Sequence, residues 1–159
     1  MKVIYAGSFD PITNGHLDII YRAREIFGEV VVAVLNNRNK KGLFTVAERM
    51  ELIEKVLEDQ NHIEVDSFEG LLVDYARERK IGTIVRGLRS ASDYENEYML
   101  AMANKNYRDG VETVFLLSAH DQLFVSSSLA KEVATFGGET DMFVPELVGQ
   151  ALKEKMEGK

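Results

Sequence analysis

The sequence AGSFDPITNGH, residues 6–16, follows an apolar run at residues 3–5 and precedes a segment with helical periodicity. This order predicts a strand that ends in a glycine-containing turn, followed by a helix. The unpaired backbone N–H groups and the positive dipole end of a helix N-terminus bind anions, above all phosphates. The turn also places a hydroxyl, at Ser8, and an imidazole, at His16, near that anion site. We therefore expect the fold to be arranged around a phosphate-binding turn.

Strand-like and helical segments alternate through the rest of the chain. The β-branched run at 30–35 is typical of a parallel strand covered on both faces, and we expect it to lie centrally. Capping-box spacings at Thr45-x-x-Glu48 and Ser92-x-x-Glu95 predict two helix starts, and Pro145 suits the first turn of a last helix with Leu147 inward. Strands are expected at 3–5, 30–35, 63–66, 83–85 and 113–117.

This alternation predicts an α/β fold. We expect one domain, residues 1–159, with a Rossmann-like open parallel sheet of five strands and helices on both faces. In such sheets the ligand crevice lies outside the carboxyl ends of the strands. Four segments after expected strands therefore meet there, and all suit phosphate: the opening turn, the loop 36–44 with Lys40 and Lys41, the RGLR element at 86–89, and the serines at 126–128.

Composition narrows the function classes. The chain has 159 residues, 45% of them hydrophobic, and a net charge of -7 at pH 7. That charge argues against a general nucleic-acid surface or an acidic-membrane surface, since both need a basic face. The absence of cysteine excludes thiolate chemistry and Cys-based zinc sites and is compatible with a reducing cytoplasm. The longest apolar stretch, 30–35, is far shorter than a membrane span, so we expect an untargeted cytoplasmic protein.

Several of these features also have a purely structural explanation. Lysine pairs in loops are usually solvated, and a serine run can serve only as a helix N-cap. Arg86 could pair with Asp93, Glu95 or Glu97, although a guanidinium directly after an apolar strand is better explained by a bound anion. No Walker lysine loop and no Gly-x-Gly-x-x-Gly fingerprint is present, which weakens the P-loop and dinucleotide-oxidoreductase hypotheses.

The three histidines differ in their context. His16, after a glycine near a helix start, is poorly explained by core packing, so a functional role is preferred. His62 lies between a helix and a strand, where a solvated turn is expected. For His120, before the serine run, ligand contact and plain surface exposure are both open.

Taken together, the motifs resemble a known family. The segment GSFDPITNGH is similar to the Thr/Ser-x-Gly-His-type signature of the nucleotidylyltransferase superfamily. Three further segments narrow the resemblance to the bacterial phosphopantetheine adenylyltransferases: the RGLR element, the acidic stretch from Asp93 to Glu97, and VSSSLxKEV at 125–133. The resemblance runs nearly from end to end of the chain.

The resemblance implies transfer of the AMP moiety of ATP to 4'-phosphopantetheine, giving dephospho-coenzyme A and pyrophosphate. It also implies magnesium (Mg2+) on the triphosphate, no protein metal ligands, and a homohexamer. The implied catalytic residues are Ser8, His16 and Lys40. The implied ATP contacts are Ser8, Phe9, His16, Gly87, Leu88, Arg89, Glu97, Gln122, Leu123, Phe124, Val125, Ser126, Ser127 and Ser128. The implied phosphopantetheine contacts are Ser8, Lys40, Leu72 and Arg86.

The mechanism expected from the residues and from the resemblance is the same. A phosphate nucleophile is already anionic, so an in-line displacement at the α-phosphate needs no general base and no covalent intermediate. His16 would donate a hydrogen bond to the α-phosphate, and Lys40 and Arg89 would add positive charge. One departure is that Gln122 stands where many relatives carry an aromatic residue. Two alternatives remain: a sister nucleotidylyltransferase with another phosphorylated acceptor, and a non-catalytic nucleotide sensor.

Overall fold

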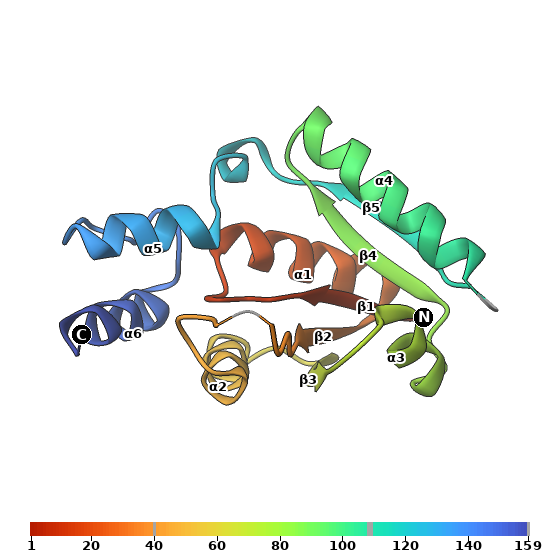
Figure 1. The fold of residues 1–159 in the computed structure, drawn as a ribbon, viewed down its shortest axis with the longest axis horizontal. Coiled ribbons are helices and arrows are strands. Elements are labelled where there is room, and N and C mark those ends of the chain that lie inside the picture. Colours follow the sequence, from red (N-terminus) through yellow and green to blue (C-terminus); the bar gives the residue numbers. More distant parts are fainter. Residues whose placement is uncertain (40, 108–109, 159) are drawn as a thin grey trace.

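The computed structural model describes residues 1–39, 41–107 and 110–158, and Figure 1 shows strands alternating with helices along this part of the chain. The strands are β1 (Lys2–Gly7), β2 (Glu29–Leu35), β3 (Ile63–Phe68), β4 (Thr83–Leu88) and β5 (Glu112–Leu117). The helices are α1 (Asn14–Phe27), α2 (Val46–Val56), α3 (Leu72–Glu78), α4 (Ala91–Asn106), α5 (Ser127–Thr135) and α6 (Glu146–Glu157), with a short 3-10 helix, η1 (His120–Gln122).

All described strands form one parallel sheet in the order β3-β2-β1-β4-β5. The central strand is β1, because Tyr5 pairs with Val32 of β2 on one side and with Val85 of β4 on the other. The run at 30–35 is an inner strand beside β1, so its expected central place was one position off. The chain order reverses between β1 and β4, which makes their carboxyl ends the topological switch point where ligands bind in such sheets. The predicted fold class is confirmed.

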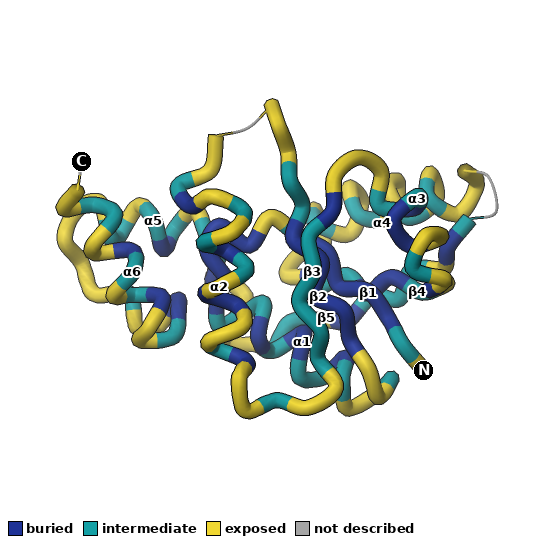
Figure 2. The backbone as a smooth tube through the Cα atoms, turned by 90° about the horizontal axis from the view of Figure 1, so that it is seen from below, coloured by how far each residue is buried: buried dark blue, intermediate teal, exposed yellow. Residues whose placement is uncertain are grey.

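Helices cover both faces of the sheet because the inner strands are apolar on both sides. Val3 and Tyr5 of β1 pack with α1 and α2, whereas Ile4 and Ala6 pack with α3. In Figure 2 the inner strands are buried, and the outer sides of the helices are exposed. Alternate residues of one strand therefore belong to two hydrophobic layers, as a parallel sheet requires.

Helix α1 begins and ends at residues that suit its two ends. Thr13 caps its N-terminus, and Gly28 ends it with φ of 96°, a left-handed conformation that glycine adopts without strain. Leu17, Ile20 and Ala23 form its buried stripe. Because α1 lies against β1, β2 and β4, its first turn stands at the switch point (Figure 1).

Two other helix starts test the predicted caps. At α2 the capping box is present, with Thr45 N–H donating to Glu48 and Glu48 N–H donating to the Thr45 hydroxyl. At α4 the cap is Ser90, whose hydroxyl accepts from Asp93 N–H at 3.2 Å, so the start predicted at Ser92 was two residues late. A serine with an acidic residue three positions later occurs at both sites, and the spacing alone could not separate them.

Strand β4 and helix α6 also differ from expectation. Strand β4 continues through Leu88, which pairs with Leu117 of β5, so three residues of the RGLR element belong to the strand. In α6 the buried residues are Val148 and Leu152, and Leu147 is 38% exposed. Val148 and Leu152 are four residues apart and lie on the same face of α6, which packs on α5 and α2. Leu147 lies on another face.

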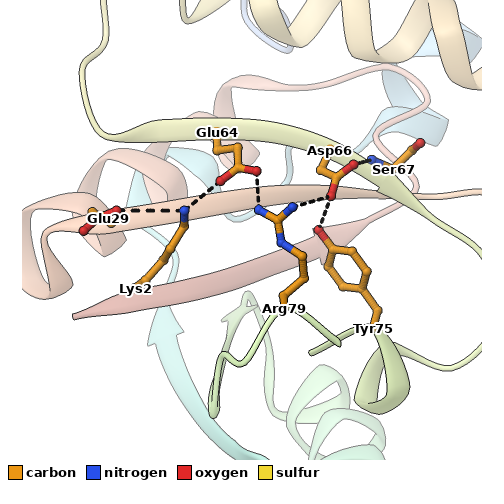
Figure 3. A network of polar contacts seen from close by, with 7 residues as sticks. All are labelled: Lys2, Glu29, Glu64, Asp66, Ser67, Tyr75 and Arg79. Carbon is orange, nitrogen blue, oxygen red and sulfur yellow. Dashed lines mark hydrogen bonds and ion pairs between the residues drawn. The ribbon is translucent and has the colours of Figure 1, made fainter. Parts of the chain in front are cut away.

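A polar network outside the switch point ties α3 to the sheet (Figure 3). Glu64 accepts from Lys2 at 2.7 Å and from Arg79, and Asp66 accepts from the Tyr75 hydroxyl at 2.7 Å and from Arg79 at 3.3 Å. Burial, with the neighbouring Asp66, raises the pKa of Tyr75, so its hydroxyl stays a donor. Arg79 therefore has a structural role, because it links the end of α3 to the edge strand β3.

None of the helices in the described ranges combines the length and apolar character needed to span a membrane.

Candidate active site

A cavity of about 620 Å³ lies at the carboxyl ends of β1 and β4. Its walls come from the turn before α1, the loop after β2, the end of β4, the first half of α4 and the N-terminus of α5. The segments predicted to meet at this edge of the sheet do meet, with Lys40 itself outside the described residues. Its neighbour Lys41 lines the cavity.

Most of the predicted site residues line this cavity: Ser8, Phe9, His16, Arg86, Gly87, Arg89, Glu97, Val125, Ser126, Ser127 and Ser128. The other predicted residues that the structure describes lie outside its lining. Leu88 is buried at the end of β4, and Phe124 is 49% exposed and packs edge-on against Phe143. Leu72, Gln122 and Leu123 are also not in contact with it, and the contacts implied for these residues stay predictions. His62 and His120 are both exposed, and neither lines the cavity.

The imidazole of His16 is held in one tautomer. The backbone N–H of Thr13 donates to Nδ1 at 3.1 Å, so Nδ1 is the acceptor and Nε2 carries the proton. In return, the His16 backbone N–H donates to the Thr13 hydroxyl at 3.3 Å. Burial, with the nearby charges of Arg89 and Arg86, lowers the pKa of His16 to about 4. At neutral pH, His16 is thus a neutral Nε2–H donor in the cavity wall.

Aromatic rings pack against the imidazole of His16 on its buried side. Phe9, which is 2% exposed, packs edge-to-face on His16 at 5.0 Å and on Tyr5 at 5.5 Å between ring centroids. Burial raises the pKa of Tyr5, so its hydroxyl is neutral. Gly87 allows close packing here, because a Cβ at that position would lie 3.0 Å from Ile19. The rings fix the direction of His16 and keep water from its inner side.

The N-terminus of α5 faces the same cavity. Ser126 caps the helix by accepting from Leu129 N–H at 3.1 Å, and the Ser127 hydroxyl donates to the Pro11 carbonyl at 2.7 Å. Arg89 donates to the Val125 carbonyl at 3.1 Å, which ties the end of β4 to the same segment. A nine-residue helix with its first turn open to a cavity offers N–H groups and a dipole to an anion.

Arg86 and Glu97 form a closed pair. The Arg86 Nε and Nη2 atoms each donate to one Glu97 carboxylate oxygen at 2.6 Å, and Nη1 donates to the Ala6 carbonyl at 2.8 Å. Burial by itself lowers the pKa of Arg86. The hydrogen bonds and the negative charge of Glu97 outweigh this effect, so the pKa of the guanidinium lies above its usual value. The ion pair considered from the sequence is present, with Glu97 as its acid, and both partners line the cavity.

The cavity is locally basic, although the chain is acidic overall. Its described lining carries the cations Lys41, Arg49, Arg86, Arg89 and Lys131 and the anions Asp10, Asp93 and Glu97. The net charge of the whole chain is -7. A polyanion is therefore attracted to this edge of the sheet and not to the surface in general.

Four residues of the cavity lining were not predicted from the sequence: Asp10, Thr13, Arg49 and Lys131. Three of these residues stand inside the quoted motifs: Asp10 and Thr13 lie between Ser8 and His16, and Lys131 follows the serine run. For Arg49 the signal was its helical spacing, since Arg49 is three residues after the apolar Val46 and four before the apolar Ile53 and so shares a face of α2 with them. Arg49 is indeed only 8% exposed.

No cluster of three or more metal-ligating side chains occurs within residues 1–39, 41–107 and 110–158. The acidic residues of the cavity are engaged instead, Asp10 with Lys131, Asp93 with Arg89 and Glu97 with Arg86.

Comparison with known proteins points to one family. The model of the cytidylyltransferase-like family matches residues 4–133. A phosphopantetheine adenylyltransferase of Alkaliphilus metalliredigens is 53% identical over 156 residues, which are 98% of this chain and 99% of the relative. The proteins of the same name from Natranaerobius thermophilus and Synechococcus elongatus are 48% and 52% identical, over 96% and 98% of this chain and 94% and 93% of theirs.

Among solved structures, the fold is similar to that of a lipopolysaccharide core biosynthesis protein from Thermoplasma volcanium. The TM-score is 0.55 at 20% identity, and the match covers 75% of this chain and 98% of the other. At this identity the likeness concerns the fold alone.

Proposed function

The chain belongs to the phosphopantetheine adenylyltransferase branch of the cytidylyltransferase-like family, and on that premise we propose both its reaction and the roles of its residues. It transfers AMP from ATP to 4'-phosphopantetheine, giving dephospho-coenzyme A and pyrophosphate, a step of coenzyme A biosynthesis. The observation that carries the site assignment is the His16 Nε2–H donor in one basic cavity with the α5 N-terminus and two arginines.

The reaction is one displacement at phosphorus. An oxygen of the phosphopantetheine phosphate forms a bond to the α-phosphorus of ATP while the bond from that phosphorus to the α,β-bridging oxygen breaks. Pyrophosphate leaves with the electron pair of that bond. The nucleophile is already anionic, so no side chain has to remove a proton, and the protein acts through positioning and charge stabilisation.

His16 stabilises the charge that develops on the α-phosphate. Its Nε2–H is the donor that the Thr13 hydrogen bond leaves free, and the lowered pKa keeps the ring from titrating near neutral pH. A preoriented donor of this kind contributes roughly 10²-fold to 10³-fold in rate. Ser8 adds a hydroxyl beside it, and Lys40, which lies outside the described residues, adds charge from the loop.

The two phosphorylated substrates occupy opposite sides of His16 in this proposal. The α5 N-terminus, with the neighbouring Arg89, suits the β- and γ-phosphates of ATP. Arg86, deeper at the end of β4, suits the phosphate of phosphopantetheine, whose oxygens would compete with Glu97 for the guanidinium.

Magnesium enters this proposal as part of the substrate. Mg2+ is usually bound through substrate phosphates and water, so the cation is expected on the phosphate oxygens of ATP. A cytoplasmic location belongs to the same proposal, since the reaction draws on the ATP of that compartment.

We also propose a homohexamer, which the exposed apolar side chains of α4 support. These are Tyr94, Tyr98, Met99, Leu100 and Met102, each at least 40% exposed, and no residue of α4 is buried. Large exposed apolar patches of this kind mark contact surfaces.

One assay tests the function against its alternatives. ATP is offered with 4'-phosphopantetheine, nicotinamide mononucleotide, flavin mononucleotide or a phosphorylated alcohol in turn, and pyrophosphate is measured. The proposal predicts release with 4'-phosphopantetheine only. Release with another acceptor would indicate a sister transferase, and ATP binding without release would indicate a nucleotide sensor.

A further inference from the structure

The carboxylate of Asp10 holds the end of the loop after β2. Asp10 is 8% exposed, and its two oxygens accept from Leu43 N–H and Phe44 N–H, each at 2.9 Å. Gly42 permits this approach, because a Cβ there would lie 3.0 Å from Asp10 Oδ2 and 2.9 Å from the Phe44 carbonyl oxygen. Lys131 of α5 donates to the same carboxylate at 3.2 Å. One buried side chain thus joins the loop to the turn that carries Ser8.

Arg49 of α2 holds the same loop end from the other side. Its Nε donates to the Phe44 carbonyl at 3.1 Å, and its Nη1 donates to the Ser8 carbonyl at 2.8 Å and to the Leu35 carbonyl at 3.4 Å. Among the described residues no carboxylate pairs with Arg49, although it is 8% exposed. Burying a cation without an acid is costly, so a structural need for its fork of donors accounts for its presence better than an ion pair does.

These contacts meet at one residue. The Phe44 N–H donates to Asp10, and the Phe44 carbonyl accepts from Arg49. Arg49 also donates to the carbonyl of Ser8. The loop held in this way carries Lys41 into the cavity, where Ser8 lies as well. Neither Asp10 nor Arg49 belongs to the residues assigned above to the reacting phosphates.

We propose that Asp10 and Arg49 form a clamp on Phe44 that sets the position of Ser8 relative to the lysine loop, residues 36–44. Both are positioning residues for adenylyl transfer, and the proposal rests on the function proposed above. Misplacing catalytic groups by about 1 Å costs roughly 10²-fold in rate, so the clamp acts on turnover more than on substrate affinity.

The test uses Asp10→Asn, Arg49→Lys and the double variant. Asparagine keeps one acceptor but faces the second N–H with an amide, and lysine keeps the charge of Arg49 without its fork. The matched control is Ile53→Val, a fully buried position of α2 outside the cavity lining, where one methyl group is lost. The melting temperature and the kcat and KM for both substrates are measured for every protein.

Each single variant is expected to lower kcat at least 10-fold with the KM for ATP within threefold of wild type. Ile53→Val is expected to lower the melting temperature with kcat unchanged. Because both residues hold Phe44, the double variant should lose far less than the product of the single losses. Single variants with kcat within twofold of wild type, or fully multiplicative losses, would overturn the clamp.

Two outcomes need a separate interpretation: a variant that does not fold, and a wild-type protein without activity. If Arg49→Lys does not fold, Asp10→Asn alone against Ile53→Val decides between positioning and mere stability. If the wild-type protein releases no pyrophosphate, the proposed function fails. An active wild type with unaffected variants overturns only the clamp.

Discussion

At the scale of single residues, the central one is His16, whose neighbours prescribe its chemistry. The Thr13 N–H fixes the tautomer, Phe9 fixes the ring plane, and burial beside two arginines keeps the ring neutral. A neutral histidine can donate from Nε2 but is a poor proton donor near pH 7. Its role is therefore that of a hydrogen-bond donor and not of a general acid.

Replacing His16 by alanine should lower kcat by at least about 10²-fold, because one preoriented donor to the α-phosphate is lost. Folding should be nearly unchanged, as judged by circular dichroism. His62→Asn is the control, since His62 is an exposed histidine with φ of 66°, a conformation that asparagine tolerates. Turnover near the wild-type value in His16→Ala would remove His16 from the mechanism.

The lowered pKa of His16 also makes a prediction about stability. A histidine in the unfolded chain takes up its proton near pH 6.5, whereas in the folded chain the pKa of His16 is about 4. Between these values the unfolded state binds more protons, so the contribution of His16 to stability is present above pH 6.5 and is lost as the pH falls toward 4. Urea unfolding of wild type and His16→Gln should diverge in that window. Parallel pH profiles of the two proteins would contradict the assigned ionisation.

Arg86→Ala should chiefly raise the KM for 4'-phosphopantetheine. It also leaves Glu97 without the two 2.6 Å hydrogen bonds of its partner, so the double variant Arg86→Ala/Glu97→Gln separates the loss of a phosphate ligand from the effect of an unpaired acid. The KM defect should persist in the double variant. A defect confined to ATP binding would mean that Arg86 serves the other substrate.

At the scale of elements, the N-terminus of α5 is suited to bind phosphate. Ser126 caps the helix through Leu129 N–H, and Ser127 anchors it to the opening turn. Ser126→Ala should destabilise the protein by about 1 kcal/mol through loss of the cap.

Two other changes at Ser126 separate the cap from the charge of the site. Asparagine and aspartate both cap helices well, so Ser126→Asn and Ser126→Asp should retain stability. Aspartate adds a negative charge beside the bound triphosphate, so only Ser126→Asp should raise the KM for ATP strongly, by an estimated 10-fold or more. Equal ATP affinity of the two variants would show that the triphosphate is bound elsewhere.

At the scale of the whole molecule, the exposed apolar side chains of α4 lead to a prediction about assembly. Static light scattering should give six times the chain mass of 17.9 kDa. Met99 is 69% exposed, and Met99→Glu would place a charge in the proposed contact and reduce the mass. A wild-type protein of single-chain mass would contradict the homohexamer.

Much of this architecture could be predicted because local patterns and the global fold agree. The β-branched run of β2, the Thr45 capping box and Gly28 each specify their element from a few neighbouring residues. The convergence of distant loops followed from the rule for parallel sheets. The errors arose where a long-range contact decides: the pairing of Leu88 with Leu117 extends β4, and packing on α5 turns Val148 inward in place of Leu147.

The supporting residues of the site were harder to find for a related reason. Asp10 and Arg49 act through backbone groups of Leu43, Phe44 and Ser8, and backbone groups leave no sequence pattern. For Arg49 the sequence held a signal that was not used: the residue shares a helix face with the apolar Val46 and Ile53, where a charged side chain is unusual.

A single-turnover experiment distinguishes direct transfer of AMP between two bound substrates from transfer through an adenylylated protein. Excess protein is mixed with ATP alone, and with ATP and 4'-phosphopantetheine, and pyrophosphate, dephospho-coenzyme A and the protein mass are followed. We expect pyrophosphate only when the acceptor is present, one dephospho-coenzyme A for each pyrophosphate, and an unchanged protein mass. A burst of pyrophosphate from ATP alone, with AMP attached to the protein, would contradict it.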